Sequence, residues 1–296
     1  MSMRMVMVLC ALSSVAACER APTPIEFLGD QIVLNSVINA GAAQAAVLLV
    51  RVVPDSNYRN QSVARPLPGA IVTLSDGTNS STLPPNRTPG RCSYPLYAGQ
   101  QDSALVGGCY AGSVAGGVRT GVTYSLDVQL PDGKRIHGTT TVPAPPTLRS
   151  PASGDTLQVA GPPDFNPAPV LVNWTTVVPA PLVHLVMFLP NLPCEAHMRQ
   201  PQNADGNLRI DATGRDSVTF RLSALDCGDQ NIERRPRFDA QLVLTVFDES
   251  YARYDKEFSR SSGVRSRYAA IGITGAVGVF GSAATVRLPV VLVRQR

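Results

Sequence analysis

The sequence is poor in charge, in aromatic residues and in histidine. Charged residues make up 16% and aromatic residues 6% of the 296 residues, with three histidines and one tryptophan. Once Arg4 leaves with the leader described below, 25 basic and 22 acidic residues remain, a net charge of +3. The densest basic stretch, residues 234–267, mixes eight Lys or Arg with five Asp or Glu. Such a mixed surface is typical of a solvated face, so we expect no nucleic-acid partner.

The scarcity of histidine leaves few ways to build a catalytic site. The sequence contains no G-x-S-x-G, S-x-x-K or H-E-x-x-H motif. His137 falls on an expected exposed strand face and His184 in an apolar strand, where burial is the default. Cys194-Glu195-Ala196-His197 could look like metal ligands, but its cysteine is expected in a disulfide. We therefore expect no enzyme activity, no catalytic or metal-binding residue and no cofactor.

The N-terminal apolar run is too short to cross a membrane. Met5–Leu12 is far below the roughly 18–20 residues that a spanning helix needs, and one Arg precedes it. This pattern predicts a secretory signal peptide, residues 1–17, followed by a tether, residues 18–30. At its end the chain reads Val15-Ala16-Ala17-Cys18.

These four residues resemble the bacterial lipobox, although Val15 stands where Leu is more usual. The resemblance implies cleavage before Cys18 and lipidation of its sulfur, and several acyl chains give stable anchoring. Glu19 follows where an enterobacterial inner-membrane retention signal has Asp, which favours the outer membrane. The alternative is a plain cleaved signal with an accidental cysteine.

Six cysteines are present, and two are assigned to the leader and the lipid, Cys10 and Cys18. In an exported chain the remaining even number predicts disulfides. Four cysteines allow three pairings; the local one joins Cys92 to Cys109 and Cys194 to Cys227, and keeps each bridge within one half of the chain. Close Cys-x-x-Cys spacing, which a zinc site would favour, is missing.

Long helical patterns are also missing, whereas turn residues are abundant: Gly and Pro supply 49 residues. Short β-rich runs between turns predict an all-β fold of two immunoglobulin-like or transthyretin-like sandwiches. We expect a first sandwich over residues 31–148, a Pro-rich linker over 149–167 and a second sandwich over 168–296.

The clearest strand is predicted over residues 122–130, where apolar and polar residues alternate strictly. Pro131-Asp132-Gly133 predicts a turn, and residues 134–142 are the expected partner strand. Other strands are predicted over 31–39, 44–53, 70–74, 156–160, 170–174, 182–189, 217–222 and 240–247.

The stretch 54–68 is predicted as a polar loop, and the stretch 78–121 as a long loop or a ragged hairpin pinned by the first disulfide. One helix is expected over 250–258. Residues 284–293 are predicted as an edge strand, because Pro289 has no backbone N–H to donate to a neighbouring strand.

Two stretches, residues 67–77 and 124–134, resemble the carboxypeptidase-regulatory-like, transthyretin-type sandwich. Together with the lipobox, the exit Thr139-Thr140-Thr141-Val142-Pro143, Tyr251 and Tyr254, and Gly278-Val279-Phe280-Gly281-Ser282, the layout resembles an uncharacterised family of bacterial cell-surface lipoproteins. Genes of that family often lie beside TonB-dependent outer-membrane receptors. One departure precedes the last motif, where residues 274–277 hold a single glycine instead of a pair.

This resemblance implies a noncatalytic lipoprotein of the outer membrane or cell surface that binds a ligand or serves as an accessory to a TonB-dependent receptor. The ligand class, small molecule, glycan or peptide, stays open. Contacts are expected from loops at the sandwich ends, over 54–66, 78–121 and 190–216. The alternatives are a structural spacer or adhesin-like envelope protein and, less favoured, a hydrolase on a β scaffold.

Overall fold

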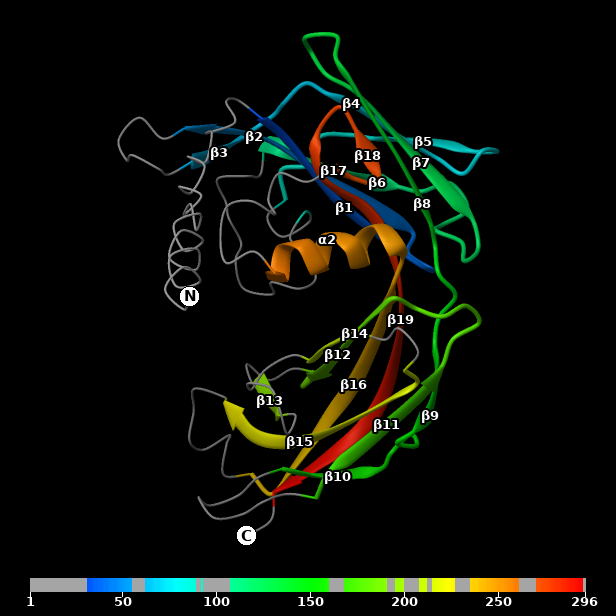
Figure 1. Cartoon of the computed structure of the whole chain (residues 1–296), viewed down its shortest axis with the longest axis vertical. Coiled ribbons are helices and arrows are strands. Elements are labelled where there is room, and N and C mark those ends of the chain that lie inside the picture. Colours follow the sequence, from blue (N-terminus) through cyan, green and yellow to red (C-terminus); the bar gives the residue numbers. More distant parts are fainter. Residues whose placement is uncertain are drawn as a thin grey trace, which may run out of the picture.

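The computed structural model describes residues 31–54, 62–88, 92, 107–159, 168–190, 195–199, 208–211, 215–226, 235–260 and 270–294. Within these residues one element is an α-helix and the others are β-strands. The strands form a 14-stranded sheet and a five-stranded sheet. The predicted all-β sandwich architecture is confirmed. Figure 1 shows two β bodies, one above the other, along a shared spine of long strands.

The first body combines the N-terminal strands with two short late ones. Their bounds are β1 Gln31–Asn39, β2 Gln44–Pro54, β3 Ser62–Pro66, β4 Ile71–Ser75, β5 Ser80–Leu83, β6 Cys109–Ser113, β7 Thr123–Gln129, β8 Arg135–Thr141, β17 Ala270–Ile271 and β18 Ile273–Thr274. The five-stranded sheet has the order β18-β8-β7-β4-β5. The strands predicted near residues 31, 44 and 70 are present. Strand β3 lies in the stretch 54–68, which was predicted as a loop, and that prediction was wrong. Strands β5 and β6 lie in the stretch 78–121, where a loop or ragged hairpin was predicted, and an antiparallel bridge joins Pro85 to Tyr110.

The hairpin of β7 and β8 is confirmed almost to the residue. Tyr124, Leu126 and Val128 are buried while the residues between them face outward, as period-two alternation requires. Gly133 has a φ of 83° in the connecting turn, a conformation that glycine adopts without cost. The buried side chains pack against Leu34, Leu49 and other apolar residues from the facing sheet.

Backbone hydrogen bonds close the first body at both edges of its sheets. On one side Ala111 N–H donates to Pro84 O at 3.0 Å, which joins β6 to the end of β5. On the other side Thr139 N–H donates to Gly272 O at 3.2 Å, beside β18. The exposed strand edges that invite unwanted pairing are thereby covered at these positions.

The second body holds the remaining strands: β9 Thr147–Ser150, β10 Thr156–Val159, β11 Val170–Thr175, β12 Leu182–Phe188, β13 Glu195–Arg199, β14 Leu208–Asp211, β15 Ser217–Asp226 and β16 Arg237–Phe247. Its core includes Trp174, only 2% exposed, together with Leu185, Phe220 and Leu244. The predictions of a core tryptophan and of a covered strand β12 are confirmed.

The last strand, β19 (Val277–Arg294), runs through both bodies. Its first part pairs with β1 in parallel, and its later part pairs with β16 in antiparallel. Phe280 lies in the first core, whereas Ala284 and Leu292 lie in the second. The strand predicted over 284–293 therefore begins earlier than expected.

The edge assignment of β19 was wrong, because the strand lies between β1 and β16. Pro289 is tolerated for a local reason. On the side away from β16, the partner β1 ends its pairing at Ala283 and β10 begins at Val291. Pro289 falls in the gap between these two partners, where its missing N–H breaks no ladder bond.

Helix α2 (Glu249–Arg260) confirms the single predicted helix. Asp248 caps it: the N–H of Tyr251 donates to Oδ1 at 3.1 Å and the N–H of Ser250 to Oδ2 at 3.3 Å. Tyr251 is buried against Phe247, with ring centroids 4.4 Å apart, and joins a small cluster with Val279. The helix thus covers the junction between the two bodies (Figure 1).

The predicted domain boundaries stay predictions. Part of the expected linker, 149–167, is structured, because β9 reaches Ser150 and β10 spans Thr156–Val159. Residues 160–167 lie outside the described part of the chain.

Candidate functional site

Several predicted site residues lie outside the described residues. These are the lipidation residue Cys18, the second cysteine pair Cys194 and Cys227, and parts of the predicted contact loops. What the structure describes of those loops is largely strand: β3, β5, β6, β13 and β14. Their roles in anchoring, bridging and binding therefore stay predictions.

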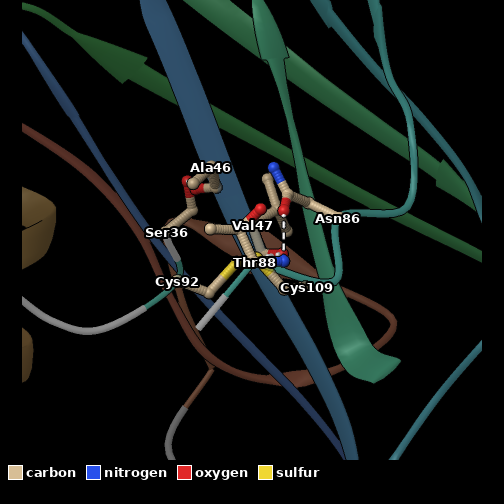
Figure 2. Close-up of a disulfide and its surroundings, with 7 residues drawn as sticks. All are labelled: Ser36, Ala46, Val47, Asn86, Thr88, Cys92 and Cys109. Carbon is tan, nitrogen blue, oxygen red and sulfur yellow. Dashed lines mark hydrogen bonds between the residues drawn. A yellow bond between two sulfur atoms is a disulfide. The ribbon is translucent and has the colours of Figure 1, made fainter. Parts of the chain in front are cut away.

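The first cysteine pair forms a disulfide, Cys92–Cys109, with Cα atoms 5.6 Å apart (Figure 2). Cys109 is the buried first residue of β6, and the Cys92 sulfur lies 3.3 Å from the carbonyl oxygen of Val47 on β2. Asn86 N–H donates to Cys109 O, and Thr88 N–H donates to the Asn86 side chain at 2.7 Å. The bridge therefore fixes the chain after β5 to the body and has a structural role.

The outer face of the five-stranded sheet is the best candidate for a binding surface. Opposite its buried core face it presents nine hydroxyl side chains from all five strands, which we call the hydroxyl face: Thr73, Ser75, Ser80, Thr82, Thr123, Ser125, Thr139, Thr141 and Thr274. The ladder register places them in rows; one row contains Thr139, Ser125, Ser75 and Ser80. Each hydroxyl can both donate and accept a hydrogen bond.

One ionisable pair lies within the hydroxyl face. His137 Nδ1 is 2.9 Å from Oδ1 of Asp127, and both side chains are more than half exposed, at 51% and 64%. Thr274 donates to the backbone oxygen of His137, and Ile71 adds an exposed apolar group to the same face, 57% exposed. Arg135 lies on the same face, opposite Gln129, and is exposed, so the face is polar and carries one further positive charge. It suits recognition of a polar partner through many weak hydrogen bonds.

A second polar cluster is buried where the bodies meet. Asp248 accepts hydrogen bonds from the Thr140 hydroxyl, at 2.8 Å, and from the Ser282 N–H, at 3.0 Å. The Ser282 hydroxyl donates to Thr141 O at 3.0 Å, and Ser282 is fully buried. Burial raises the pKa of the Asp248 carboxyl, and the hydrogen bonds it accepts partly oppose that rise. Because these groups satisfy one another in the interior, this cluster joins elements and does not face a ligand.

His137 is paired with Asp127 on the exposed hydroxyl face, and the other two histidines lie in the second body. His184 is 3% exposed and lies edge-on to Phe247, with ring centroids 4.6 Å apart. His197 has no described side chain. Across the described ranges no group of three His, Cys, Asp or Glu side chains could hold a metal ion. Among those same residues no helix is long and apolar enough to cross a membrane.

The sequence did not predict that the residues of the hydroxyl face come together, nor that Asp248, Thr140 and Ser282 do. Alternation did place Thr123, Ser125 and Asp127 on a polar strand face, so part of the hydroxyl face was visible. The contribution of β4, β5 and β18 depends on pairing between distant segments. For Asp248 the signal was local, because an aspartate directly before a helical stripe predicts an N-cap.

The comparisons with known proteins yield a family and no activity. No curated protein matches the sequence. The similar solved structures include three N-terminal domains of the highly immunogenic outer capsid protein of bacteriophage RB49, at 10% identity, with 90% of this chain and 71% of that chain covered and a TM-score of 0.22. A structure of a 1.5-MDa bacterial ice-binding adhesin, described in terms of host cell surface retention, is 12% identical. The match covers 90% of this chain and 65% of that chain, with a TM-score of 0.21. Adhesin InvE of Yersinia pseudotuberculosis is 20% identical, with 75% of this chain and 55% of that chain covered and a TM-score of 0.19.

Likenesses this low carry no argument about fold or function. The family comparison is more informative, because a family model matches residues 21–172, more than half of the chain. That match covers strands β1 to β8 of the first body and continues through β9 and β10 into β11, but it does not include β17 and β18. The expected membership of an uncharacterised family is confirmed at this level: the chain belongs to the family described as a domain of unknown function, DUF4249.

Proposed function

We propose that this chain is a noncatalytic lipoprotein of the outer-membrane surface, held by lipid on Cys18, which binds a ligand or serves as an accessory to a TonB-dependent receptor. The observation that carries the binding role is the hydroxyl face. It is an open surface on a sheet whose five strands are joined by continuous ladders, so it presents its groups in fixed positions. Fixed donors and acceptors bind at a lower entropic cost than mobile ones.

The anchor is tested on the native protein. Mass spectrometry of the N-terminal peptide from detergent-extracted membranes should find acyl groups on Cys18. Cys18→Ala should leave the protein in the soluble fraction, since two or more acyl chains provide the stable anchoring. A native N-terminal peptide without acyl groups would remove the lipoprotein part of the proposal.

The accessory role is tested by crosslinking the acylated protein in intact cells and purifying it from outer membranes. A receptor should be recovered with the wild type and lost with Thr139→Lys, which places a charge in the middle of the hydroxyl face. Thr219→Lys is the matched control, because Thr219 is an exposed threonine on β15 of the second body. If no receptor is recovered, or if both variants behave alike, the hydroxyl face is not the receptor contact.

A structural spacer is the second candidate, and one observation favours it. Strand β19 belongs to both cores, so the two bodies are held by one continuous ladder and not by the Pro-rich connection alone. Such a unit would hold a partner at a fixed distance from the membrane. This candidate gains if glycan and peptide binding screens fail while deletion of the protein weakens the cell envelope.

A further inference from the structure

The composition of the hydroxyl face narrows the class of partner that it can bind. Besides the nine hydroxyls, its five strands, all within the described part of the chain, turn only these groups to the same side: Ile71, Gln129, Arg135 and the pair of His137 and Asp127. The ladder register places Ile71, Gln129 and Arg135 in one row, at the end of the face next to the β7–β8 turn. The rest of the face consists of hydroxyls around one carboxyl and one imidazole.

This composition does not match what proteins or phosphate-bearing partners need. Binding energy at protein interfaces comes mainly from Trp, Tyr and Arg anchors, and here Arg135 is the only such side chain and lies in the end row. Nucleic acids and anionic lipid surfaces are bound through several positive charges, whereas Asp127 is 64% exposed near the middle of this face. The face therefore suits a partner that is itself rich in uncharged hydrogen-bonding groups.

The shape of the surface disfavours peptides and small ligands. An extended peptide commonly binds by adding a strand to a free sheet edge, but Thr139 N–H of β8 already donates to Gly272 O at the β18 side. At the other side Ala111 N–H donates to Pro84 O, directly after β5. Sites for small molecules are concave, whereas the hydroxyl face is the outer side of a sheet. A partner that reaches most of these groups must extend over several strands.

The hydroxyls form rows that cross the strands and suit a linear polymer. One row crosses four strands and consists of Thr139, Ser125, Ser75 and Ser80. Neighbouring strands lie about 4.8 Å apart, so this row spans roughly 15 Å. A sugar unit in an extended polysaccharide is about as long as the spacing between two strands, and it carries hydroxyls that both donate and accept. Such a chain can hydrogen-bond to successive positions of the row.

The neighbouring row adds a stronger acceptor. Asp127 lies there between His137 and Thr73, and its Oδ1 is 2.9 Å from His137 Nδ1. An ionised carboxylate accepts several hydrogen bonds, and bonds to it are stronger than bonds between neutral groups. Sugar hydroxyls are suitable donors, whereas the carboxylates or sulfates of an acidic polysaccharide would be repelled. Most of the nine hydroxyls belong to threonine, whose restricted χ1 keeps the entropic cost of binding low.

We propose that the hydroxyl face binds a neutral polysaccharide that lies in an extended conformation across the strands. This proposal rests on the ligand-binding version of the proposed function and names its ligand class. The row from Thr139 to Ser80 contacts consecutive sugar units, and Asp127 accepts hydrogen bonds from sugar hydroxyls beside that row. Because the binding energy is spread over many weak hydrogen bonds, affinity depends on the length of the sugar chain.

The test uses the full mature chain in a zwitterionic detergent, first on an array of neutral and acidic polysaccharides. Titration calorimetry then uses oligosaccharides of increasing length from the neutral polysaccharide that binds best. Affinity should rise up to about four sugar units, which fill the row, and then level off. Thr139→Val and Asp127→Asn should each weaken binding roughly fivefold, through loss of one hydroxyl contact and of the carboxylate charge.

The matched control is Thr219→Val, which removes an exposed hydroxyl from β15 of the second body and should bind like the parent chain. Absence of binding to every neutral polysaccharide, preference for acidic ones, or an affinity independent of length would each overturn the proposal. Equal weakening by Thr139→Val and Thr219→Val would also overturn it.

A protein partner is a separate outcome of the same experiments. If Thr139→Lys loses the receptor in crosslinking while the wild type binds no polysaccharide, the hydroxyl face contacts a protein and the polysaccharide proposal is wrong. Acylation of Cys18 and recovery of the receptor are measured separately. Failure of polysaccharide binding is therefore distinguishable from failure of the anchor or of the accessory role.

Discussion

The Thr140 hydroxyl lies 2.8 Å from Oδ2 of Asp248, although 108 residues separate the two in the chain. Thr140 belongs to β8 of the first body, whereas Asp248 follows β16 of the second and caps helix α2. Ser282 of β19 completes the contact through its N–H. One carboxyl group thus joins three elements at the place where the bodies meet.

Replacement of Asp248 should destabilise the whole chain. Asp248→Ala removes a helix cap, worth about 1 kcal/mol, and leaves the buried Ser282 N–H without its acceptor. The Thr140 hydroxyl keeps Ser282 Oγ, 2.8 Å away, as its acceptor. We expect the free energy of unfolding, measured in urea, to fall by about 2–4 kcal/mol. Asp239→Ala, at an exposed aspartate on β16, should change it by less than about 0.5 kcal/mol. Equal effects would show that Asp248 has no special role.

The Asp248 carboxyl should make the folded state more stable at acidic pH than at higher pH. Burial raises the folded-state pKa of Asp248 above the unfolded value of about 3.9, so folding favours the protonated form. Its contribution is full below the unfolded pKa and is lost as the pH rises through the folded pKa. The difference in unfolding free energy between wild type and Asp248→Asn, measured across this pH range, should therefore shift against the wild type as pH rises. A difference that moves the other way would contradict the assigned pKa direction.

Gly133 and Gly278 both have a positive φ, but only at Gly278 would an added Cβ atom also collide with a neighbouring strand. Substituting each by alanine therefore separates backbone strain from steric conflict. Gly278 has a φ of 109° and lies where a Cβ atom would collide with the carbonyl oxygen of Leu34, its partner in the β1–β19 ladder. Gly133 has a φ of 83° but faces open space. Gly133→Ala should cost about 1–2 kcal/mol, whereas Gly278→Ala should cost about 3 kcal/mol or more, in thermal or urea unfolding. Similar costs would mean that β1 and β19 do not approach this closely.

The Cys92–Cys109 bridge should stabilise the folded state by restricting the unfolded chain. Its sequence separation is 17, and a loop of about this size corresponds to roughly 3 kcal/mol in the chain-entropy model. We expect Cys92→Ala with Cys109→Ala to lower the unfolding free energy by about this amount. Reduction with dithiothreitol of a variant carrying Cys194→Ala and Cys227→Ala, in which only this bridge can form, should give a similar value. An unchanged unfolding curve after reduction would contradict the stabilising role.

Local patterns were enough to predict the elements whose signal lies within a short window. The β7–β8 hairpin was visible because apolar and polar residues alternate on both sides of a Pro-Asp-Gly turn. Helix α2 was visible because Tyr251 and Tyr254 share a stripe. Trp174 was placed in the core because its strand alternates cleanly. In each case neighbouring residues already determine which face is buried.

The early part of β19 was missed because its signal is not local. Gly278, Gly281 and Ser282 have little strand propensity, and they are present because other elements pack close to them. A Cβ atom at Gly281 would lie 2.9 Å from Tyr251 of α2. The hydroxyl face was only partly predictable for the same reason, since Thr82 and Thr274 reach it through pairing with distant strands.

The parallel pairing of β1 with β19 places residues 33 and 277 side by side. During synthesis the N-terminal strands emerge first, yet the first body stays incomplete until residues 277–283 can pair with β1. Contacts between such distant segments form slowly. The first half of the chain must therefore wait with a half-built sandwich, and truncation near the C-terminus should harm the N-terminal body as much as the strands next to the cut.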